Sequence, residues 1–533
     1  MAKWTRLFYT IRYLKPIQLY YRFFYILRNR FFKTSKFEKL SKDPTEKTWK
    51  DFLTAPASQF ENQFIFLNQE HDFGQKVDWN FSGFGKLWTY NLNYFDFLNQ
   101  SAMKKEEGLR LIEDYLQARS ALRDGMEPYP ISLRSINWIK FLSRNNIVDS
   151  NITVALYNDL QVLRKNVEYH LMGNHVLENG FSLLFGAVYF DDINLYNKAQ
   201  RILRDQLEEQ LLDDGGHFER SPMYHQILLG RLLDCIQFIR NNELEFLQED
   251  FIVFLTEKAQ IMSCWLHTIT FKNGNIPMFN DSAFGIAPNS NELLAYAMQL
   301  GIEVRGIQLK GSGYRKFSFD SVEFIFDVGE IGPDYQPGHA HSDTFGFEFY
   351  QNRCPILVDT GTSTYEKNEL RQRERGTAAH NTVKVGKHEQ SEVWGGFRVA
   401  KRAKVSLIKD EQKEVQASHN GYQKIGVEHQ RNFILQSDAI IIKDKLIAKA
   451  NNGDNAVAFF HLHPKIKECE IKDNAVILPD FGLKLHFSQG ILKIAEGTYE
   501  FAVGFNKRLE AKQLQVHFQN ELTTTIQIET KID

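Results

Sequence analysis

The segments Phe317-Ser318-Phe319-Asp320 and Val322-Glu323-Phe324-Ile325-Phe326 mark the point at which apolar and polar residues begin to alternate. Alternation with a period of two is typical of strands that bury one face. From about residue 305 to the end of the chain, further short runs of this kind are separated by Gly, Asn and Asp. Many short strands joined by turn residues predict an antiparallel β-sandwich in this part of the chain.

The part before residue 305 has a helical period instead. Leu203, Leu207 and Leu211 recur every four residues, and Asp214-Gly215-Gly216 ends that pattern. We expect a long helical region over 87–116, and helices over 132–141, 154–172, 181–190, 193–212, 224–239, 251–268 and 292–300. Successive helices with short connections predict hairpins packed side by side. Periodicity leaves open whether they form a bundle, a solenoid or a closed ring.

Bulk composition excludes several classes of protein. A chain of 533 residues is long for one core, so two or more domains are expected. A net charge of −2 gives no electrostatic reason to bind nucleic acid. The four cysteines are far apart without a CxxC motif, which indicates neither a disulfide framework nor a cysteine zinc site. We expect buried thiols in a reducing compartment.

The N-terminal 33 residues are basic and aromatic. They hold eight Lys or Arg residues, no acidic residue, and eleven Trp, Phe or Tyr residues. The segment lacks an uninterrupted apolar run and a small-residue cleavage site, so no signal peptide is evident, and it is too charged to span a membrane. Two interpretations stay open: a helix packed on the main body with a solvated basic face, which we favour, and an amphipathic segment on an anionic membrane surface.

Two dense polar clusters interrupt the helical part. The first is Gly173-Asn174-His175-Val176-Leu177-Glu178, in which Asn174 is also placed to cap a helix. The second is Ser221-Pro222-Met223-Tyr224-His225, which is also what a helix start with Ser as cap and Pro at the first position looks like. Alone, either cluster is explained by helix capping.

The third cluster, His339-Ala340-His341-Ser342-Asp343, is followed by Asp359 and His380. If this stretch is a strand, both imidazoles point to one side. Two imidazoles, a carboxylate and a third imidazole at this spacing are ligand types that suit zinc. Metal hydrolases with an HxHxDH motif need a histidine where this chain has Thr344, which argues against a hydrolytic dinuclear site.

In this order, the three clusters resemble those of the heparinase II/III-like polysaccharide lyases, which include several alginate lyases. The block Thr377-Ala378-Ala379-His380-Asn381-Thr382-Val383 is the most specific match, and Val358-Asp359-Thr360-Gly361 and residues 129–138 also fit. The resemblance covers roughly residues 85–450. It implies an α+β multidomain fold, with an incomplete (α/α) toroid followed by an antiparallel β-sandwich. We expect a segment over 1–40, a toroid domain over 41–305 and a β-domain over 306–533.

The resemblance also implies site roles for β-elimination at a uronic acid. Asn174 and His175 would neutralise the substrate carboxylate, and Tyr224 and His339 would act as acid and base, in an order that stays open. Glu178 would orient one of these groups or contact the sugar. Arg375 would contact the acidic polymer, and Arg134 would either line the cleft or hold the 129–132 loop. Arg371 and Arg373 are expected in a solvated charged loop.

A tyrosine base would need a nearby cation, since a free phenol has a pKa near 10. By the same resemblance, His341, Asp359 and His380 would bind one zinc ion that holds a loop of the β-domain, a structural rather than catalytic role.

The resulting hypothesis is a lyase that cleaves a uronate-containing polysaccharide, linked to surface-polysaccharide synthesis on the cytoplasmic side. The expected partner is an acidic polysaccharide, with peripheral membrane contact through the N-terminal segment as an open addition. The alternative is a non-catalytic glycan-binding or assembly factor with the same fold. The full set of Asn174, His175, Tyr224 and His339 favours the enzyme.

Overall fold

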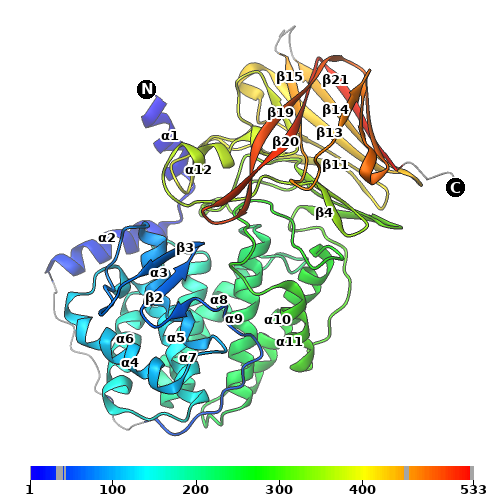
Figure 1. Ribbon diagram of the computed structural model, residues 1–533. Coiled ribbons are helices and arrows are strands. Elements are labelled where there is room, and N and C mark those ends of the chain that lie inside the picture. Colours follow the sequence, from blue (N-terminus) through cyan, green and yellow to red (C-terminus); the bar gives the residue numbers. More distant parts are fainter. Residues whose placement is uncertain (1, 32–39, 41–43, 449–454, 529–533) are drawn as a thin grey trace.

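The computed structural model describes residues 2–31, 40, 44–448 and 455–528 (Figure 1). Lys33 and part of the expected 1–40 segment lie outside the described residues. A helical region is followed along the chain by a sheet-rich region, and the two lie against each other at one end. Small sheet β1-β2-β3 precedes the main helices and consists of β1 (Gln59–Phe60), β2 (Gln63–Phe66) and β3 (Gln69–Asp72).

The helical region consists of helices joined by short connections. They are α3 (Lys86–Tyr94), α4 (Lys105–Ala118), α5 (Pro128–Arg144), α6 (Ser150–Lys165), α7 (Asn174–Phe190), α8 (Ile193–Gln210), α9 (Pro222–Arg240), α10 (Glu249–Ile269) and α11 (Ser290–Gln299). The expected continuous helical region over 87–116 is wrong. Helix α3 ends at Phe95, which adopts a left-handed conformation with φ 61° and buries its ring in the core.

Burial separates inner helices from outer ones. In α7 every residue from Val176 to Tyr189 is buried, as expected for a helix surrounded by protein. In α8 only a stripe that includes Leu195, Leu203 and Leu207 is buried, as expected for a helix on the outside. Helix α7 contacts α5, α8 and α9. The inner position of α7 brings its N-terminus, with Asn174 and His175, to the end of the helical region that faces the sheets.

The sheet-rich region contains antiparallel sheets. An eight-stranded sheet has the order β11-β12-β13-β14-β21-β18-β17-β16, and two four-stranded sheets have the orders β19-β20-β15-β8 and β4-β5-β6-β7. The strands are β4 (Tyr314–Phe319), β5 (Val322–Asp327), β6 (Phe347–Gln351), β7 (Cys354–Leu357), β8 (Val383–Val385), β11 (Val405–Glu411), β12 (Glu414–His419), β13 (Val427–Leu435), β14 (Ala439–Ala448), β15 (Ala456–His461), β16 (Glu470–Lys472), β17 (Ala475–Leu478), β18 (Leu483–Ser488), β19 (Ile491–Gly504), β20 (Lys507–Phe518) and β21 (Glu521–Ile528). A short pair, β9 (Val393–Trp394) with β10 (Arg398–Val399), and α12 (Glu369–Glu374) lie in the connections.

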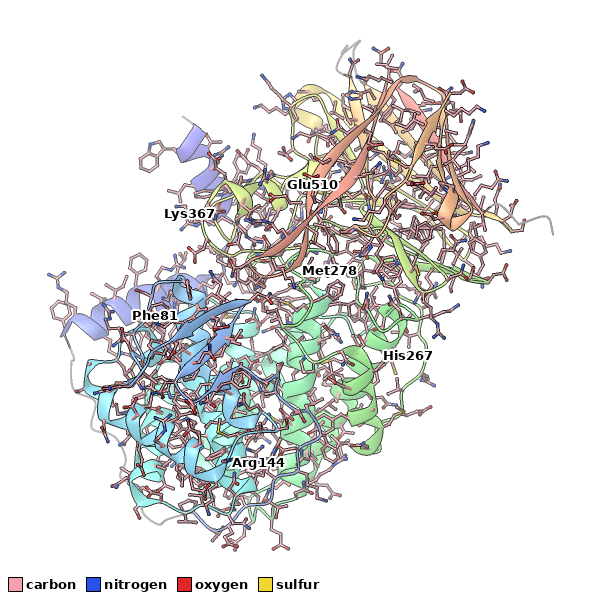
Figure 2. The ribbon with its side chains drawn as sticks, in the orientation of Figure 1. Phe81, Arg144, His267, Met278, Lys367 and Glu510 are labelled. Carbon is pink, nitrogen blue, oxygen red and sulfur yellow. The ribbon has the colours of Figure 1, made fainter. Side chains whose placement is uncertain are left out.

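The two regions are joined by polar contacts as well as by packing. The backbone amide of Met278 donates to Glu348 Oε1 on β6 at 2.7 Å, and Figure 2 shows Met278 where the regions meet. Lys316 Nζ on β4 donates to the carbonyl of Thr270 at 2.8 Å. These contacts fix the segment that follows α10 against strands β4 and β6.

The N-terminal segment forms two helices, α1 (Ala2–Ile11) and α2 (Pro16–Phe31), at one edge of the molecule (Figure 1). Both helices contact the main body, and Arg12, Arg22 and Arg30 are exposed, as expected for helices packed on the body with a solvated basic face. Aromatic and aliphatic side chains of both helices are exposed, among them Trp4, Phe23 and Phe31. No helix among the described residues is both long enough and apolar enough to cross a bilayer.

Candidate active site

The first polar cluster begins helix α7. Gly173 is the N-cap with φ 61°, and its carbonyl-side neighbour Asn174 is the first helical residue. The expected capping role of Asn174 is wrong, because its amide turns away from the helix and donates to Glu219 Oε2 at 2.9 Å. A Cβ at Gly173 would lie 2.3 Å from Glu219 Oε1, so glycine is needed here for both conformation and space.

His175 follows on the next position of α7 and remains partly exposed. Its Nδ1 lies 3.2 Å from Glu168 Oε2, and its ring centroid lies 4.6 Å from that of Tyr129. Burial lowers the pKa of His175, but the carboxylates of Glu168, Glu219 and Glu178 outweigh burial and raise it above 6.5. His175 is therefore placed to carry a positive charge beside Asn174.

The second cluster begins helix α9, and its capping interpretation is confirmed. Ser221 is the N-cap and accepts from the amide of Tyr224 at 3.3 Å, with Pro222 as the first helical residue. The side chain of Tyr224 projects from this first turn toward the sheet-rich region. Its hydroxyl lies 3.2 Å from the hydroxyl of Tyr365.

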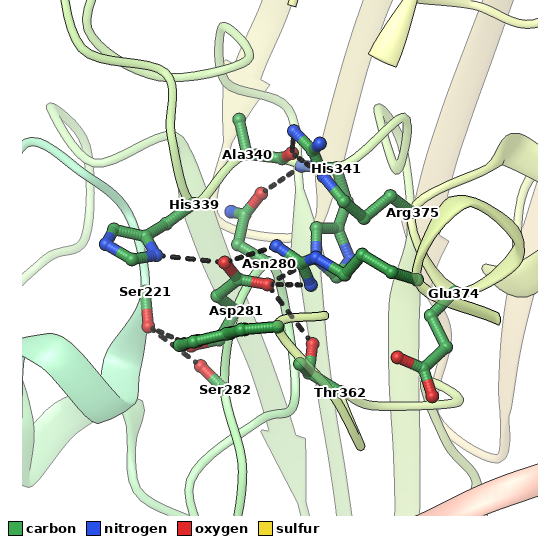
Figure 3. Close-up of polar contacts among 12 residues, drawn as sticks. Ser221, Asn280, Asp281, Ser282, His339, Ala340, His341, Thr362, Glu374 and Arg375 are labelled. Atoms are coloured by element: carbon green, nitrogen blue, oxygen red, sulfur yellow. Dashed lines mark hydrogen bonds and ion pairs between the residues drawn. The ribbon is translucent and has the colours of Figure 1, made fainter. Parts of the chain in front are cut away.

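The third cluster lies in a loop before β6 rather than in a strand. The side chains of His339 and His341 nevertheless converge, and their common partner is the carboxylate of Asp281 (Figure 3). His339 Nδ1 lies 2.9 Å from Asp281 Oδ2, and His341 Nε2 lies 2.9 Å from Asp281 Oδ1. The first interpretation, two histidines on one metal, is therefore replaced by two histidines on one carboxylate.

Asp281 is a fully buried anion surrounded by donors. Both terminal nitrogens of Arg371 donate to it, Arg371 Nη2 at 2.7 Å, and Thr362 donates at 3.3 Å. Burial alone would raise the pKa of Asp281, but Arg371 and the two histidines hold it well below its usual range. A carboxylate that is ionised at neutral pH thus fixes the orientation of the His339 ring.

Asn280 joins the loops that carry these groups. Its φ of 56° is left-handed, a conformation that Asn tolerates better than most residues. Its Nδ2 donates to the carbonyl of Arg220 at 2.9 Å, just before the cap of α9, and its Oδ1 accepts from the amide of His341 at 2.9 Å. This side chain therefore ties the start of α9 to the histidine loop.

Tyr224 and His339 meet face to face. Their ring centroids are 3.9 Å apart with an interplanar angle of 32°. The Nδ2 atom of Asn174 lies 3.4 Å from His339 Nε2, so the three segments meet at one point. Burial raises the pKa of Tyr224 well above 10, which keeps the phenol protonated at neutral pH. The sequence-based idea of a phenolate at the start of α9 does not fit this environment.

The three expected zinc ligands lie near one another. His341 and His380 have ring centroids 5.4 Å apart, and Asp359 Oδ2 lies 2.7 Å from His380 Nδ1. His341 Nδ1 and His380 Nε2 are buried without a hydrogen-bond partner. Imidazole and carboxylate donors with two orphaned ring nitrogens fit zinc. Within residues 2–31, 40, 44–448 and 455–528, however, no group of three or more His, Cys, Asp or Glu is arranged to hold a metal ion.

The residues expected to contact the substrate lie elsewhere. Arg134 is buried and pairs with Asp159 at 2.7 Å, so it braces the helical region. Arg375 is buried and donates to backbone carbonyls, including that of Ala340 at 2.8 Å, so it holds the histidine loop. Glu178 is buried with Arg231 Nε at 3.4 Å, and burial raises its pKa. In this structure none of these three side chains is open to a polymer.

Several residues of the site were missed or misjudged from the sequence. Arg371, assigned to a solvated loop, is buried against Asp281 and lies over the ring of Tyr365 at 5.0 Å. Arg373 is exposed as expected. Asp281 had one signal, the polar run Asn280-Asp281-Ser282 between the apolar pairs on either side. Glu219 lies two residues before the Ser221 cluster and Tyr365 lies four residues after Gly361, but no local sequence pattern distinguishes either of them as a site residue.

Comparison with known proteins places this fold. The solved structure of heparinase III aligns with a TM-score of 0.68 at 17% identity, covering 86% of this chain and 81% of that one. A mutant heparan sulfate lyase from Pedobacter heparinus aligns with a TM-score of 0.59 at 17% identity, covering 88% of this chain and 81% of that one. At such identities the likeness establishes the arrangement of a helical region followed by a sheet-rich region.

Sequence comparison finds relatives that are named as heparin-sulfate lyases. A heparin-sulfate lyase of Bacteroides thetaiotaomicron is 23% identical over 299 residues, which is 49% of this chain and 41% of that protein. That of Bacteroides stercoris is 21% identical over 245 residues, 40% of this chain and 36% of that protein. The chain thus spans less than half the length of these curated relatives.

Two family models account for most of the sequence. The heparinase II/III N-terminus model matches residues 129–297, and the heparinase II/III-like C-terminal model matches residues 304–529. The matches follow one another in the same order as the helical and sheet-rich regions. The chain belongs to the heparinase II/III-like family.

Proposed function

We propose that this protein is a polysaccharide lyase that cleaves a uronate-containing glycosaminoglycan by β-elimination. The observation that carries the proposal is the meeting of Tyr224, His339 and Asn174 at one point, with His339 oriented by Asp281. The curated relatives are named as heparin-sulfate lyases. Because the chain spans only part of their length, its activity and substrate are inferred from its own site.

β-Elimination makes three demands on a site. A base must remove the proton at C5 of the uronate, and an acid must protonate the oxygen that leaves from C4. The carboxylate must also be met by hydrogen-bond donors or cations, because negative charge spreads onto it in the transition state. Each demand has a residue of matching chemistry at the point where the two regions meet.

His339 is the base in this proposal. With Nδ1–H donated to the Asp281 carboxylate, the lone pair of the neutral imidazole lies on Nε2. Nε2 is the ring nitrogen that Asp281 does not contact, and it lies 3.4 Å from Asn174 Nδ2 and 3.7 Å from Glu219 Oε2. A proton taken from C5 would make an imidazolium that Asp281 stabilises.

Tyr224 is the acid. Its raised pKa keeps it protonated, so it can donate to the leaving oxygen without first losing a proton. The hydroxyl of Tyr365 at 3.2 Å orients the phenol and can share its proton while the leaving group departs. The elimination then proceeds in three steps. One proton moves from C5 to His339 Nε2, the C4–O bond breaks, and the Tyr224 proton is transferred to the leaving oxygen to form the new hydroxyl.

Asn174 and His175 neutralise the substrate carboxylate. The contact from Asn174 Nδ2 to His339 Nε2 is long at 3.4 Å, which leaves that amide hydrogen available to a ligand. His175 brings a cation to the adjacent position of α7. The start of α7 adds its backbone dipole, which favours an anion there.

The test of the function is direct. Purified protein is incubated with heparan sulfate, heparin, chondroitin sulfate, hyaluronan and alginate, and the ultraviolet absorbance of an unsaturated uronate is followed. We expect new absorbance with at least one polymer. Binding of a polymer without any new absorbance, in protein that is folded and metal-loaded, would support the alternative of a non-catalytic glycan-binding factor.

The charge on His175 predicts a pH dependence. Since Glu168 helps to raise the pKa of His175, the cation persists above pH 6.5 and is lost as the pH rises through the folded value. Turnover should fall on that alkaline side, and Glu168→Gln should move the fall to lower pH. Stability from the ion pair is likewise fully present below pH 6.5 and lost over the same rise. Glu208→Gln, at an exposed pair with Lys258, should leave the profile in place.

Zinc is part of the proposal as a structural ion held by His341, Asp359 and His380. When bound, it would fix the loop after β7 and the 377–383 block against the histidine loop, and it takes no part in proton transfer. We expect purified protein to contain one zinc per chain by mass spectrometry. At about 100 times Kd the ion would add about 2.7 kcal/mol to the free energy of unfolding.

His341→Ala and His339→Ala are matched variants two positions apart. His341→Ala should lose the zinc and unfold at lower temperature. His339→Ala should keep the zinc and lose turnover, because its ring contacts Asp281 and Tyr224 rather than His380. If both variants contain as much zinc as the unmodified protein, His341 is not a zinc ligand.

The finer architecture and the cellular role are also proposed. Contacts of α7 with α5 and α9, and the outer position of α8, support an incomplete (α/α) toroid over 41–305, and the stacked antiparallel sheets support a β-sandwich over 306–533. The four free cysteines support a cytoplasmic, reducing location. There the protein would trim a surface polysaccharide during its synthesis, which cell fractionation and glycan-length analysis of a deletion strain would test.

A further inference from the structure

Helix α2 exposes its apolar face to solvent. Ile17, Tyr20, Phe23, Phe24, Leu27 and Phe31 are spaced by three or four residues, so they share one face. Each of these side chains is between 38% and 67% exposed. Single exposed apolar residues are ordinary, but a continuous stripe of this length on one helix marks an interaction surface.

The opposite face of α2 holds it on the protein. The buried Gln18 donates to the carbonyl of Leu171 at 3.2 Å, and the hydroxyl of Tyr25 donates to that of Val167 at 2.6 Å. The ring of Tyr21 lies 4.7 Å from that of Tyr169. A helix that only covered the body would bury its apolar stripe. This helix is attached through polar and tyrosine contacts, with the stripe turned outward.

Helix α1 repeats the arrangement. Trp4, Phe8 and Ile11, at positions i, i+4 and i+7, are 76%, 63% and 44% exposed. The helix is attached to the sheet-rich region by Arg6 Nε, 2.7 Å from Glu392, and by Thr10, which accepts from Trp394 Nε1 at 3.2 Å. The N-terminal apolar face, as named below, consists of Trp4, Phe8, Ile11, Ile17, Tyr20, Phe23, Phe24, Leu27 and Phe31.

The N-terminal segment itself carries charge of one sign. The first 33 residues contain eight basic and no acidic residues, in a chain whose net charge is −2. Among the described side chains of α1 and α2, Arg12, Arg22 and Arg30 are exposed. A second copy of the same face would bring like charges together, which opposes self-association. An anionic surface that also accepts Trp, Tyr and Phe satisfies both the charge and the apolar stripe.

We propose that the N-terminal apolar face docks on an anionic lipid bilayer, with α1 and α2 lying in the plane of the interface. The apolar side chains would enter the boundary between head groups and acyl chains, while the arginines pair with lipid phosphates. Since α1 is attached to the sheet-rich region and α2 to the helical region, docking would hold both regions at the membrane. Proton transfer in the site needs none of these residues, so the two proposals fail separately.

The test uses the full chain and vesicles of defined composition. Flotation with phosphatidylcholine vesicles is compared with flotation on vesicles that also contain phosphatidylglycerol. We expect binding to the anionic vesicles that weakens as salt is raised. Fluorescence of Trp4, isolated by subtracting a Trp4→Phe variant, should shift to shorter wavelength on binding.

Two variants of this face, each with a matched control elsewhere on the surface, distinguish specific docking from non-specific adsorption to vesicles. Phe23→Ser with Leu27→Ser should weaken vesicle binding about 100-fold, because two large apolar side chains no longer leave water. Leu492→Ser with Leu509→Ser removes similarly exposed residues from β19 and β20 and should bind as the unmodified protein does. Arg22→Glu with Arg30→Glu should weaken binding at least about tenfold, whereas Lys472→Glu with Lys493→Glu should not.

Three results would overturn the proposal. One is equal binding to neutral and anionic vesicles, and another is unchanged binding by the Phe23→Ser, Leu27→Ser variant. The third is a dimer in sedimentation that this same variant converts to a monomer, which would assign the face to self-association. Because the substituted side chains are exposed, each variant should unfold at the same temperature as the unmodified protein, and its turnover on soluble polymer should be unchanged.

Discussion

Tyr224→Phe should lower turnover of the cleaved polymer about 10²- to 10⁴-fold, the range expected when a general acid is removed. The loss arises because phenylalanine keeps the ring against His339 but cannot protonate the leaving oxygen. Stability should hardly change, since the Tyr224 hydroxyl contacts the half-buried hydroxyl of Tyr365. The measurements are the initial rate of unsaturated uronate formation and the thermal midpoint.

Two further tyrosine variants make this result interpretable. Tyr365→Phe should lower turnover by a smaller factor, because it removes an orienting hydroxyl and leaves the acid in place. Tyr499→Phe, which removes a hydroxyl bonded to the carbonyl of Leu462 on another part of the chain, should leave turnover unchanged. Turnover by Tyr224→Phe equal to that of the unmodified protein would assign the acid to another group, with Tyr365 the first to examine.

Asp281→Ala should destabilise the protein by about 3–5 kcal/mol, the cost of leaving a buried charge without its partner. The uncompensated charge is the guanidinium of Arg371, which is buried and donates through two nitrogens to Asp281. Turnover should fall as well, because His339 would lose the acceptor that fixes its tautomer. Chemical denaturation measures the first effect, and the uronate assay at a temperature where the variant is folded measures the second.

A double variant separates the two roles of Asp281. Replacing a buried ion pair by apolar residues of similar volume is often close to neutral, so Asp281→Leu with Arg371→Met should recover much of the stability. It should not recover turnover, since His339 still lacks an acceptor. Lys445→Ala, at an exposed pair with Glu521, should cost at most about 1 kcal/mol. Recovery of turnover in the double variant would show that Asp281 acts on the fold alone.

The expected bounds of helices and strands agree with the structure where one local pattern, helical spacing or strand alternation, is undisturbed by tertiary contacts. Strands β4 and β5 include the alternating residues 317–319 and 322–326, because alternation and flanking turn residues agree there. Helices α9 and α10 lie within a few residues of their expected ranges, since both have apolar residues at helical spacing. The region over 87–116 failed because the burial of Phe95 in the core overrides a local pattern that continues through it.

The site was predictable only where a residue type and its position in a motif determine its role. Arg371 and Arg375 both follow Asn368 in one short charged stretch, and nothing local tells which guanidinium turns toward a buried carboxylate. In the structure, Arg371 pairs with Asp281, whereas Arg375 donates to backbone carbonyls. The same holds for Glu219, whose contact with Asn174 depends on how α7 and the turn before α9 pack.

The sequence by itself determined the order of a helical region and a sheet-rich region, the helix starts at Ser221-Pro222, and the residue types available for proton transfer. Periodicity, capping and turn chemistry are local, so a single chain displays them. Only the tertiary structure decided that His339 and His341 share Asp281, that Tyr224 stacks on His339, and that α1 and α2 turn their apolar sides outward. Those facts depend on contacts between residues 58 or more positions apart, or on which face of a helix the body covers, and a local sequence pattern determines neither.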